Sequence, residues 1–249
     1  MIERIDQAGV VILRMADGKA NTMSVEFCEM LIAHFKQALD ARAVVITGNA
    51  RIFSAGVDLV RLLDGGAPYI REFLPLLSTM FAAVFSHPTP VVAAINGHAI
   101  AGGCVLACAA DRRLIARDAG RIGVTELLVG VPFPPIAMEI MRWAMAPQYF
   151  EDALFSGATF APPDAIARGF VHEIVEPQAL LDRASAAANM LAALPPAAFA
   201  LTKRQTRQPA LQRLASGADA TDSEIEQIWT APATLARIRD YVERILRKP

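Results

Sequence analysis

The stretch "AINGHAIAGGCVLACAAD", from Ala94 to Asp111, joins two apolar runs through a pair of glycines, Gly102 and Gly103. The first run starts at Pro90, is rich in β-branched residues, and is typical of a strand that ends at the Asn96-Gly97 turn signal. The second run, "CVLACAA", favours a helix. The two glycines therefore predict that a helix begins here, directly after a turn, with its first backbone groups uncovered by side chains.

A helix that begins at these glycines would present N–H groups that have no acceptor within the helix, together with a partial positive charge. Glycine also permits a ligand to approach the backbone closely. Such an arrangement suits an anion, or an oxyanion that develops during a reaction. A tight strand-to-helix turn that needs glycine for its dihedral angles is the alternative, and the stretch alone favours that alternative.

The N-terminal half alternates predicted strands with a predicted helix. Ser24 is a suitable N-cap, and the apolar residues after it recur every four positions, as on one face of a helix. The predicted strands are nearly uniformly apolar, which indicates burial on both faces and an α/β fold. These strands are Val10–Met15, Ala43–Gly48, Pro90–Ile95 and Arg112–Ala116.

From Pro135 onward the pattern is mainly helical. The segment Pro162–Gly169 has prolines at its start and a glycine past its end, which is typical of a short helix. Val171–Glu176 is predicted as a short strand. The proline pair Pro195-Pro196 is the best boundary candidate, and we expect a core over residues 1–194 and a helical region over residues 195–249.

Composition limits the function classes. The 249 residues are 54% hydrophobic, and 24 basic against 25 acidic side chains give a formal net charge of -1. A nucleic-acid partner would call for a basic excess, so none is expected. The mean hydropathy of +0.35 is high and predicts apolar surface buried between subunits.

The cysteines and the apolar runs limit the expected cellular compartment and the expected metal and membrane partners. Three cysteines argue against a disulfide scaffold and suit a reducing cytoplasm. Cys104 and Cys108 can share a helix face, but no further ligand stands at zinc spacing, so no metal site is expected. The start of the chain lacks the pattern of a signal peptide, and Phe73–Phe85 is too short to span a bilayer, so no membrane partner is expected.

A second segment, "ARIFSAGVDLVRLL" (Ala50–Leu63), again places small residues between a strand and a possible helix. A nucleophile elbow, G-x-S-x-G, would need glycine in place of Ile52, so Ser54 is a poor nucleophile. We expect Ser54 to be a small residue that lets a ligand lie on the backbone.

The motifs "FSAGVDL", "AAINGHAIAGGCVLACAAD" and "GVTELLVGVP" together resemble the crotonase superfamily, the enoyl-CoA hydratase/isomerase group. The motifs "GKANTMS", "PPDAIARGFVHEIV" and "LTKR" match as well, in order, over roughly residues 10–205. The resemblance implies a crotonase-like spiral of ββα units with a C-terminal helical region for trimerisation or as a lid. It also implies an acyl-CoA substrate, no separate cofactor, and a homotrimer or a dimer of trimers.

By motif position, the resemblance assigns the N–H groups of Val57 and Gly102 to the thioester oxygen. Donors aimed at a developing oxyanion are each worth roughly 10²–10³ in rate. The residues that the resemblance places at the substrate are Ala20, Ser54, Ala55, Gly56, Val57, Asp58, Leu59, Gly102, Val105 and Lys203.

The family places carboxylates at two positions, and this chain departs from that pattern. One position falls on Val105, and the other falls on Glu126 in "RIGVTELLVGVP". Hydration in the two-glutamate scheme uses both groups, whereas one base can move a proton from C2 to C4 and so shift a double bond. Burial would raise the pKa of that base toward the working range. The pattern is similar to the mitochondrial-type 3,2-enoyl-CoA isomerases and predicts a Δ3-Δ2 enoyl-CoA isomerase.

Three alternatives stay open: a weak enoyl-CoA hydratase, another crotonase reaction such as decarboxylation or thioester hydrolysis, and a non-catalytic member that binds acyl-CoA.

Glu139 could supply a second acid, although its interpretation as an ion-paired helix residue is favoured. Asp58 is interpreted as a helix cap, and Asp111 as a residue that ties down the start of a strand. Lys19 and Lys203 are candidates for the CoA phosphates, because Val60 stands where the family often has lysine.

Overall fold

The computed structural model describes residues 1–49 and 52–246, so Ala50 and Arg51 of the second segment lie outside the described residues. The strands are β1 (Ile2–Gln7), β2 (Val10–Met15), β3 (Thr22–Met23), β4 (Ala43–Thr47), β5 (Ile52–Ser54), β6 (Gly56–Val57), β7 (Val91–Ile95), β8 (His98–Ile100), β9 (Arg112–Ala116), β10 (Ile122–Gly123), β11 (Thr159–Phe160) and β12 (Glu173–Val175).

The helices are α1 (Val25–Gln37), α2 (Leu59–Phe85), α3 (Gly102–Cys108), α4 (Glu126–Val129), α5 (Pro135–Ala144), α6 (Pro147–Ser156), α7 (Pro162–Ala167), α8 (Leu180–Ala192), α9 (Pro196–Thr230) and α10 (Pro232–Leu246), with a short 3-10 turn over Pro177–Ala179.

The main sheet has six strands in the order β1-β2-β4-β7-β9-β12, and all its pairs are parallel except β1 with β2. Strands β4 and β7 are buried at every position, as predicted for strands covered on both faces. A second sheet, β11-β10-β8-β5, and a parallel pair, β3 with β6, stand beside it. The predicted α/β class is confirmed.

Local sequence signals account for several elements. The Ser24 hydroxyl accepts a hydrogen bond of 3.2 Å from the Phe27 N–H and caps α1, whose Phe27, Leu31 and Phe35 are buried. Residues 62–81 lie within α2. Gly66 breaks the regular backbone there with φ 58° and ψ -152°, so the helical periodicity is interrupted in the sequence.

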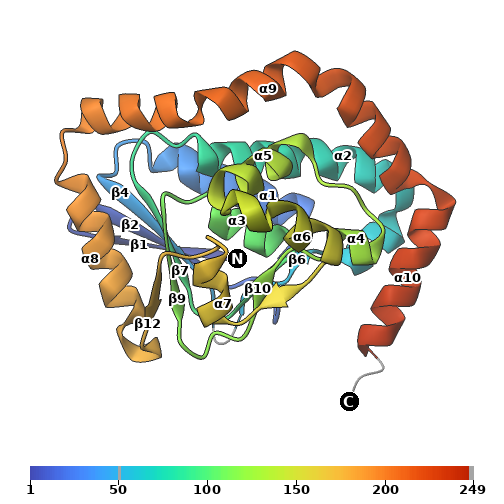
Figure 1. The fold of residues 1–249 in the computed structure, drawn as a ribbon, viewed down its shortest axis with the longest axis horizontal. Helices are drawn as coiled ribbons and strands as arrows, with labels where there is room; N and C mark the ends of the chain where they lie inside the picture. The colour runs from blue at the N-terminus through green and yellow to red at the C-terminus, as the bar shows by residue number, and fades with distance from the viewer. Residues whose placement is uncertain (50–51, 247–249) are drawn as a thin grey trace.

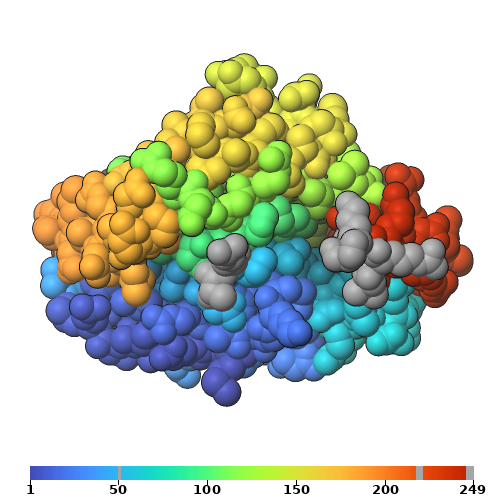
Figure 2. Space-filling view, turned by 90° about the horizontal axis from the view of Figure 1, so that it is seen from below, coloured from blue at the N-terminus to red at the C-terminus, as the bar shows by residue number. Residues whose placement is uncertain are grey.

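The helices after Pro195 join the same core as the sheet. Figure 1 shows α9 running along the edge of the molecule above α2 and α5, both of which it contacts, with α10 turning down at its end. Ile225, Trp229 and Ile238 from these helices are buried in the common hydrophobic cluster. Figure 2 shows α8 and α10 at opposite sides of the molecule, flanking the N-terminal part of the chain.

Within the described residues, no single helix has both the length and the hydropathy needed to cross a bilayer. Among these residues, the required length and hydropathy are reached only by the pair Pro177–Ala192 and Pro196–Ser216 taken together, and these two helices are bent by 101° relative to each other.

Candidate active site

A cavity of about 470 Å³ lies where α3, β6 and α4 meet α2 and the two C-terminal helices. Most of its lining is apolar. The lining residues are Ala20, Thr22, Ala55, Val57, Asp58, Leu59, Val60, Leu77, Phe81, Ile100, Ala101, Gly102, Val105, Thr125, Glu126, Val129, Val131, Pro134, Ala137, Trp229, Tyr241 and Val242.

Gly102 is the first residue of α3, as the pair of glycines predicts. Its N–H has no acceptor within the helix, because the helix begins there. Ala101, before it, has φ 52°, a left-handed value that turns the chain sharply from β8 into the helix. The backbone at this turn therefore faces the cavity.

Val57 belongs to β6, which pairs with β3 through Thr22–Gly56 and Met23–Val57. The preceding Gly56 packs against the start of α3: a Cβ atom there would lie 3.0 Å from the backbone nitrogen of Gly102. Gly56 also has φ 87°, which favours glycine. The structure thus brings Val57 and Gly102, far apart in sequence, to one wall of the cavity.

Of the predicted substrate-binding residues, Ser54 and Gly56 are not among those that line the cavity, and their role at the substrate stays a prediction. The Ser54 side chain is fully buried; its hydroxyl donates to the Asn21 carbonyl oxygen at 2.7 Å and accepts from the Gly56 N–H at 3.1 Å. Asn21, also fully buried, donates through Nδ2 to the Met15 and Phe53 carbonyl oxygens. These bonds hold the backbone of the segment that carries Val57.

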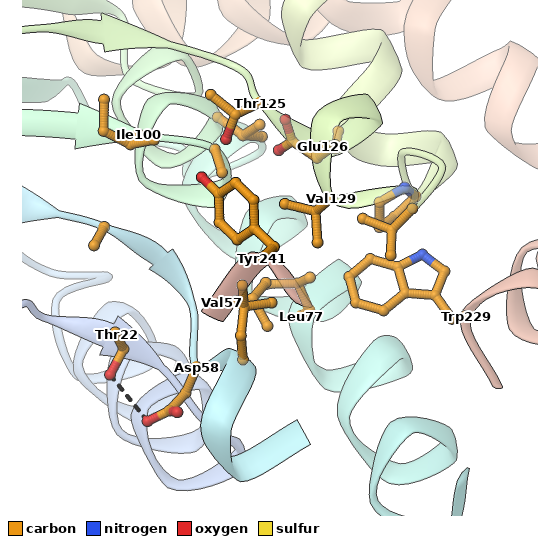
Figure 3. Close-up of a pocket in the computed structure, with 18 of the residues that line it drawn as sticks. Thr22, Val57, Asp58, Leu77, Ile100, Thr125, Glu126, Val129, Trp229 and Tyr241 are labelled. Atoms are coloured by element: carbon orange, nitrogen blue, oxygen red, sulfur yellow. Dashed lines mark hydrogen bonds between the residues drawn. The ribbon is translucent and has the colours of Figure 1, made fainter. Parts of the chain in front are cut away.

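Glu126 is the first residue of α4 and is 9% exposed. Its Oε2 has no hydrogen-bond partner among the described residues. Burial raises the pKa of this carboxyl to about 7, and the backbone N–H groups of Glu126 and Thr125 oppose the rise only partly. Figure 3 shows the carboxylate pointing into the pocket, between Thr125 and Val129. The group is a carboxylate that a small change in pH can protonate.

Val105, 1% exposed, lines the same cavity from α3. Of the described lining residues, Asp58 is the other carboxylate, and its oxygens are already engaged. Oδ1 accepts from the Arg61 N–H at 3.0 Å and caps α2, as predicted, while Oδ2 accepts from the Thr22 hydroxyl at 3.1 Å (Figure 3). Glu126 is therefore the carboxylate with an unpartnered oxygen among the described residues of the cavity lining.

Lys203 is not among the residues that line the cavity, and its predicted role at the substrate stays a prediction. It is 7% exposed, and its Nζ donates to Asp111 Oδ2 at 2.6 Å and to the Thr89 carbonyl oxygen at 3.1 Å. Burial lowers its pKa to about 8, although the Asp111 charge favours the protonated form. The motif match at "LTKR" marks a buried ion pair.

Asp111 is the centre of this ion pair. It also accepts from Arg207 Nη2 at 2.6 Å and from the Val91 N–H at 2.7 Å, at the start of β7. The interpretation of Asp111 as a residue that ties down a strand start agrees with these contacts. Glu139 likewise is ion-paired, accepting from Arg213 Nε at 3.0 Å, and does not line the cavity.

The sequence interpretation missed the part of the cavity supplied by distant elements. Trp229, Tyr241 and Val242 come from α9 and α10, and Leu77 and Phe81 come from α2. A single tryptophan in "EIEQIW" was the only signal, and an aromatic residue on a helix is ordinarily a core residue. In the described part of the chain, no group of three or more His, Cys, Asp or Glu side chains is arranged to hold a metal ion.

Comparison with known proteins shows which family shares this sequence and fold. The family model for enoyl-CoA hydratase/isomerase matches residues 6–245. A putative enoyl-CoA hydratase of Thermus thermophilus is 33% identical over 211 residues, which cover 80% of this chain and 81% of that protein. The human mitochondrial enoyl-CoA delta isomerase 1 is 26% identical over 250 residues, covering 98% and 83%.

The solved structure of human mitochondrial delta3-delta2-enoyl-CoA isomerase superimposes with a TM-score of 0.93 at 25% identity, covering 99% of this chain and 98% of that one. The predicted crotonase-like fold with its C-terminal helical region is confirmed by this likeness.

Proposed function

The chain belongs to the enoyl-CoA hydratase/isomerase family, and we propose that it is a Δ3-Δ2 enoyl-CoA isomerase. In this proposal the thioester carbonyl oxygen accepts hydrogen bonds from the N–H groups of Val57 and Gly102, and Glu126 is the base. The CoA moiety enters as part of the substrate.

The proposed reaction uses one carboxylate twice. Glu126 takes a proton from C2 of a 3-enoyl-CoA, and the electron pair of that C–H bond moves toward the thioester carbonyl to give an enolate. The two N–H groups stabilise the oxyanion as it develops. The enolate electrons then form the C2–C3 double bond, the electrons of the C3–C4 double bond take the proton back at C4, and Glu126 returns to its carboxylate form.

The observation that carries this assignment is the pair Glu126 and Val105. Isomerisation needs one proton carrier on one face of the enolate, and Glu126 has an unpartnered oxygen in the cavity. Hydration in the two-carboxylate scheme needs a second group to activate water, and Val105 brings apolar carbon to that position. The raised pKa of Glu126, about 7, suits a group that must both take and return a proton near neutral pH.

Enoyl-CoA hydration is the second candidate, because the Thermus thermophilus relative, 33% identical, is described as a putative hydratase. In that reaction the elements of water add across C2 and C3 of a 2-enoyl-CoA. Glu126 would have to serve for both the water and the C2 proton.

Product masses separate the candidates. We would incubate the protein with a 3-enoyl-CoA and, separately, with a 2-enoyl-CoA, and analyse the products by mass spectrometry and by absorbance of the conjugated thioester. The proposal expects a new conjugated thioester of unchanged mass from the 3-enoyl-CoA. A product heavier by one water as the main outcome would support the hydratase instead, and binding of both thioesters without turnover would support a non-catalytic acyl-CoA-binding protein.

The family resemblance also carries the proposal of a homotrimer or a dimer of trimers. Light scattering would test it, with an expected molar mass of three or six times the 26.8 kDa of one chain.

A further inference from the structure

Trp229 closes one end of the cavity, and its position is fixed from two sides. Its side chain is 2% exposed, although the indole ring lines the cavity. The indole Nε1 donates a hydrogen bond of 3.0 Å to the carbonyl oxygen of Pro132. Val131 and Pro134, which flank Pro132, line the cavity as well. The hydrogen bond therefore fastens one wall of the cavity to another.

The chain turns immediately after Trp229, which limits the freedom of the indole further. Helix α9 ends at Thr230, Ala231 has extended backbone with φ -64° and ψ 137°, and α10 starts at Pro232. Helix α10 then returns Tyr241 and Val242 to the same cavity. Swinging the ring aside would break the hydrogen bond between the indole Nε1 and the Pro132 carbonyl oxygen.

The cavity has an exposed end and a buried end. One end carries the polar pair Thr22 and Asp58, both half-buried, and, near Asp58 along the chain, Val60, which is 51% exposed. At the other end, Val129 and Trp229 are both buried. Figure 3 shows Thr22 and Asp58 on the opposite side of the pocket from Trp229, with Val57 and Leu77 between them.

These two ends determine how a bound acyl-CoA is oriented in the cavity, an inference that rests on the proposed function. A thioester held at Val57, Gly102 and Glu126 must send its polar, charged CoA portion out through the exposed end. Its acyl chain then extends over Val129 toward the indole, since apolar groups gain by leaving water.

We propose that Trp229 is the specificity-determining residue that sets the longest acyl chain that this protein accepts. The indole is the fixed end wall of the acyl cavity, so the cavity has a set depth. Each methylene that fits between the thioester and the ring gains affinity, and the first methylene that meets the ring gains none. The substrate class is an enoyl-CoA whose chain ends at Trp229.

Binding of saturated acyl-CoA thioesters tests this without using turnover, because these compounds have no double bond to move or hydrate. We would measure affinities by calorimetry for even-numbered chains from four to sixteen carbons. For wild type we expect a gain of about fourfold per methylene up to a break, after which affinity levels off or falls. In W229L the break should move to chains longer by at least two methylenes.

Two further variants complete the test. W229F keeps a smaller aromatic ring at the end of the cavity and loses the hydrogen bond to Pro132, so its break in affinity should move less than that of W229L. If W229L does not fold, which the absence of a cooperative unfolding transition would show, W229F replaces it in the test. W143F is the matched control, because Trp143 packs against Phe85 outside the cavity lining, and its break should equal that of wild type.

The outcomes distinguish the two proposals. The same break in wild type and in the folded Trp229 variants would overturn the role of Trp229 and leave the proposed function standing, and so would an equal shift in W143F. Absence of acyl-CoA binding at every chain length in wild type would overturn both.

Discussion

The backbone of Gly56 lies against the backbone nitrogen of Gly102, so closely that a Cβ atom on Gly56 would come within 3.0 Å of that nitrogen and 2.9 Å of the Ile100 carbonyl oxygen. Two segments from different parts of the chain therefore meet through bare backbone. This contact sets the spacing between β6, which carries Val57, and the first turn of α3.

We expect G56A to damage both folding and catalysis. Alanine must adopt φ 87° there, and its methyl group must displace the start of α3. Misplacing one oxyanion donor should lower kcat by roughly 10²–10³. Gly66 provides a control, because it also has positive φ, 58°, but no atom within 4 Å of the added Cβ. G66A should cost only the backbone strain of about 1–3 kcal/mol, because φ 58° with ψ -152° is a conformation that essentially only glycine adopts, and should leave kcat unchanged. Equal kcat values for G56A and G66A would contradict this view of the contact.

The rate should depend on pH through the ionisation of Glu126. A base works in its deprotonated form, and burial raises the pKa of this group to about 7. We expect kcat/KM to fall about tenfold per pH unit below that value and to level off above it. E126Q should lose activity by 10² or more at every pH. E139Q, which alters a carboxyl outside the cavity, should keep the wild-type pH profile; loss of the inflection in E139Q instead of E126Q would contradict the assignment.

The same pKa predicts a dependence of stability on pH. The carboxyl titrates near 4.5 in its ordinary state and near 7 in the fold, so the folded chain holds the proton over that interval. The stability contributed by the neutral form is fully present below pH 4.5 and is lost as pH rises through 7. Because one pKa unit corresponds to about 1.4 kcal/mol, E126Q should exceed wild type in free energy of unfolding by on the order of 3 kcal/mol at pH 8 and match it near pH 4.5. Urea unfolding at both pH values measures this, and E126Q less stable than wild type at pH 8 would contradict it.

Val105 should control the choice between isomerisation and hydration. V105E would restore a second carboxylate beside Glu126, and we expect hydration of 2-enoyl-CoA to rise on the order of 10²-fold over V105Q. Isomerisation should fall, because like charges further raise the pKa of Glu126. V105Q has nearly the same shape without the charge and should gain no hydration. Equal hydration in the two variants would show that the charge at residue 105 does not select the reaction.

The ion pair around Asp111 should matter for stability and leave substrate affinity alone. D111N leaves Lys203 and Arg207 buried without their carboxylate, which should cost about 3–5 kcal/mol. K203M keeps Asp111 paired with Arg207 and should cost about 1–3 kcal/mol. The KM for an acyl-CoA should stay within about twofold of wild type in K203M. A tenfold rise in KM at unchanged stability would support Lys203 as a substrate ligand.

Local patterns were sufficient for α1 and for the main-sheet strands β2, β4, β7, β9 and β12, but the edge strand β1, six residues long, was not predicted. Strands β2 and β9 have the predicted limits, and Ser24 caps α1 because a side-chain oxygen and an apolar repeat act within one turn. The strands β5, β6, β8 and β10, each two or three residues long, were not identified. They are too short for periodicity, and pairing with neighbours such as β3 and β8 defines them.

For the candidate site, the family resemblance assigned Val57, Gly102, Val105 and Glu126 by motif position, and all four line the cavity. It could not show which way a buried side chain points. Ser54 turns toward Asn21, and Lys203 turns toward Asp111, which no spacing along the chain reveals. Trp229 joins the site only because α9 crosses the whole molecule.

The contribution of α9 and α10 also sets an order of events during synthesis. The ribosome releases Glu126 about a hundred residues before Trp229, and Val57 and Gly102 earlier still, and nascent chains acquire structure from the N-terminal side first. A chain released only as far as Glu126 therefore lacks the residues of α9 and α10 that line the cavity. The enclosed cavity comes into being only with the last two helices, so a chain that stops short of Trp229 lacks the enclosure even if its sheet has formed.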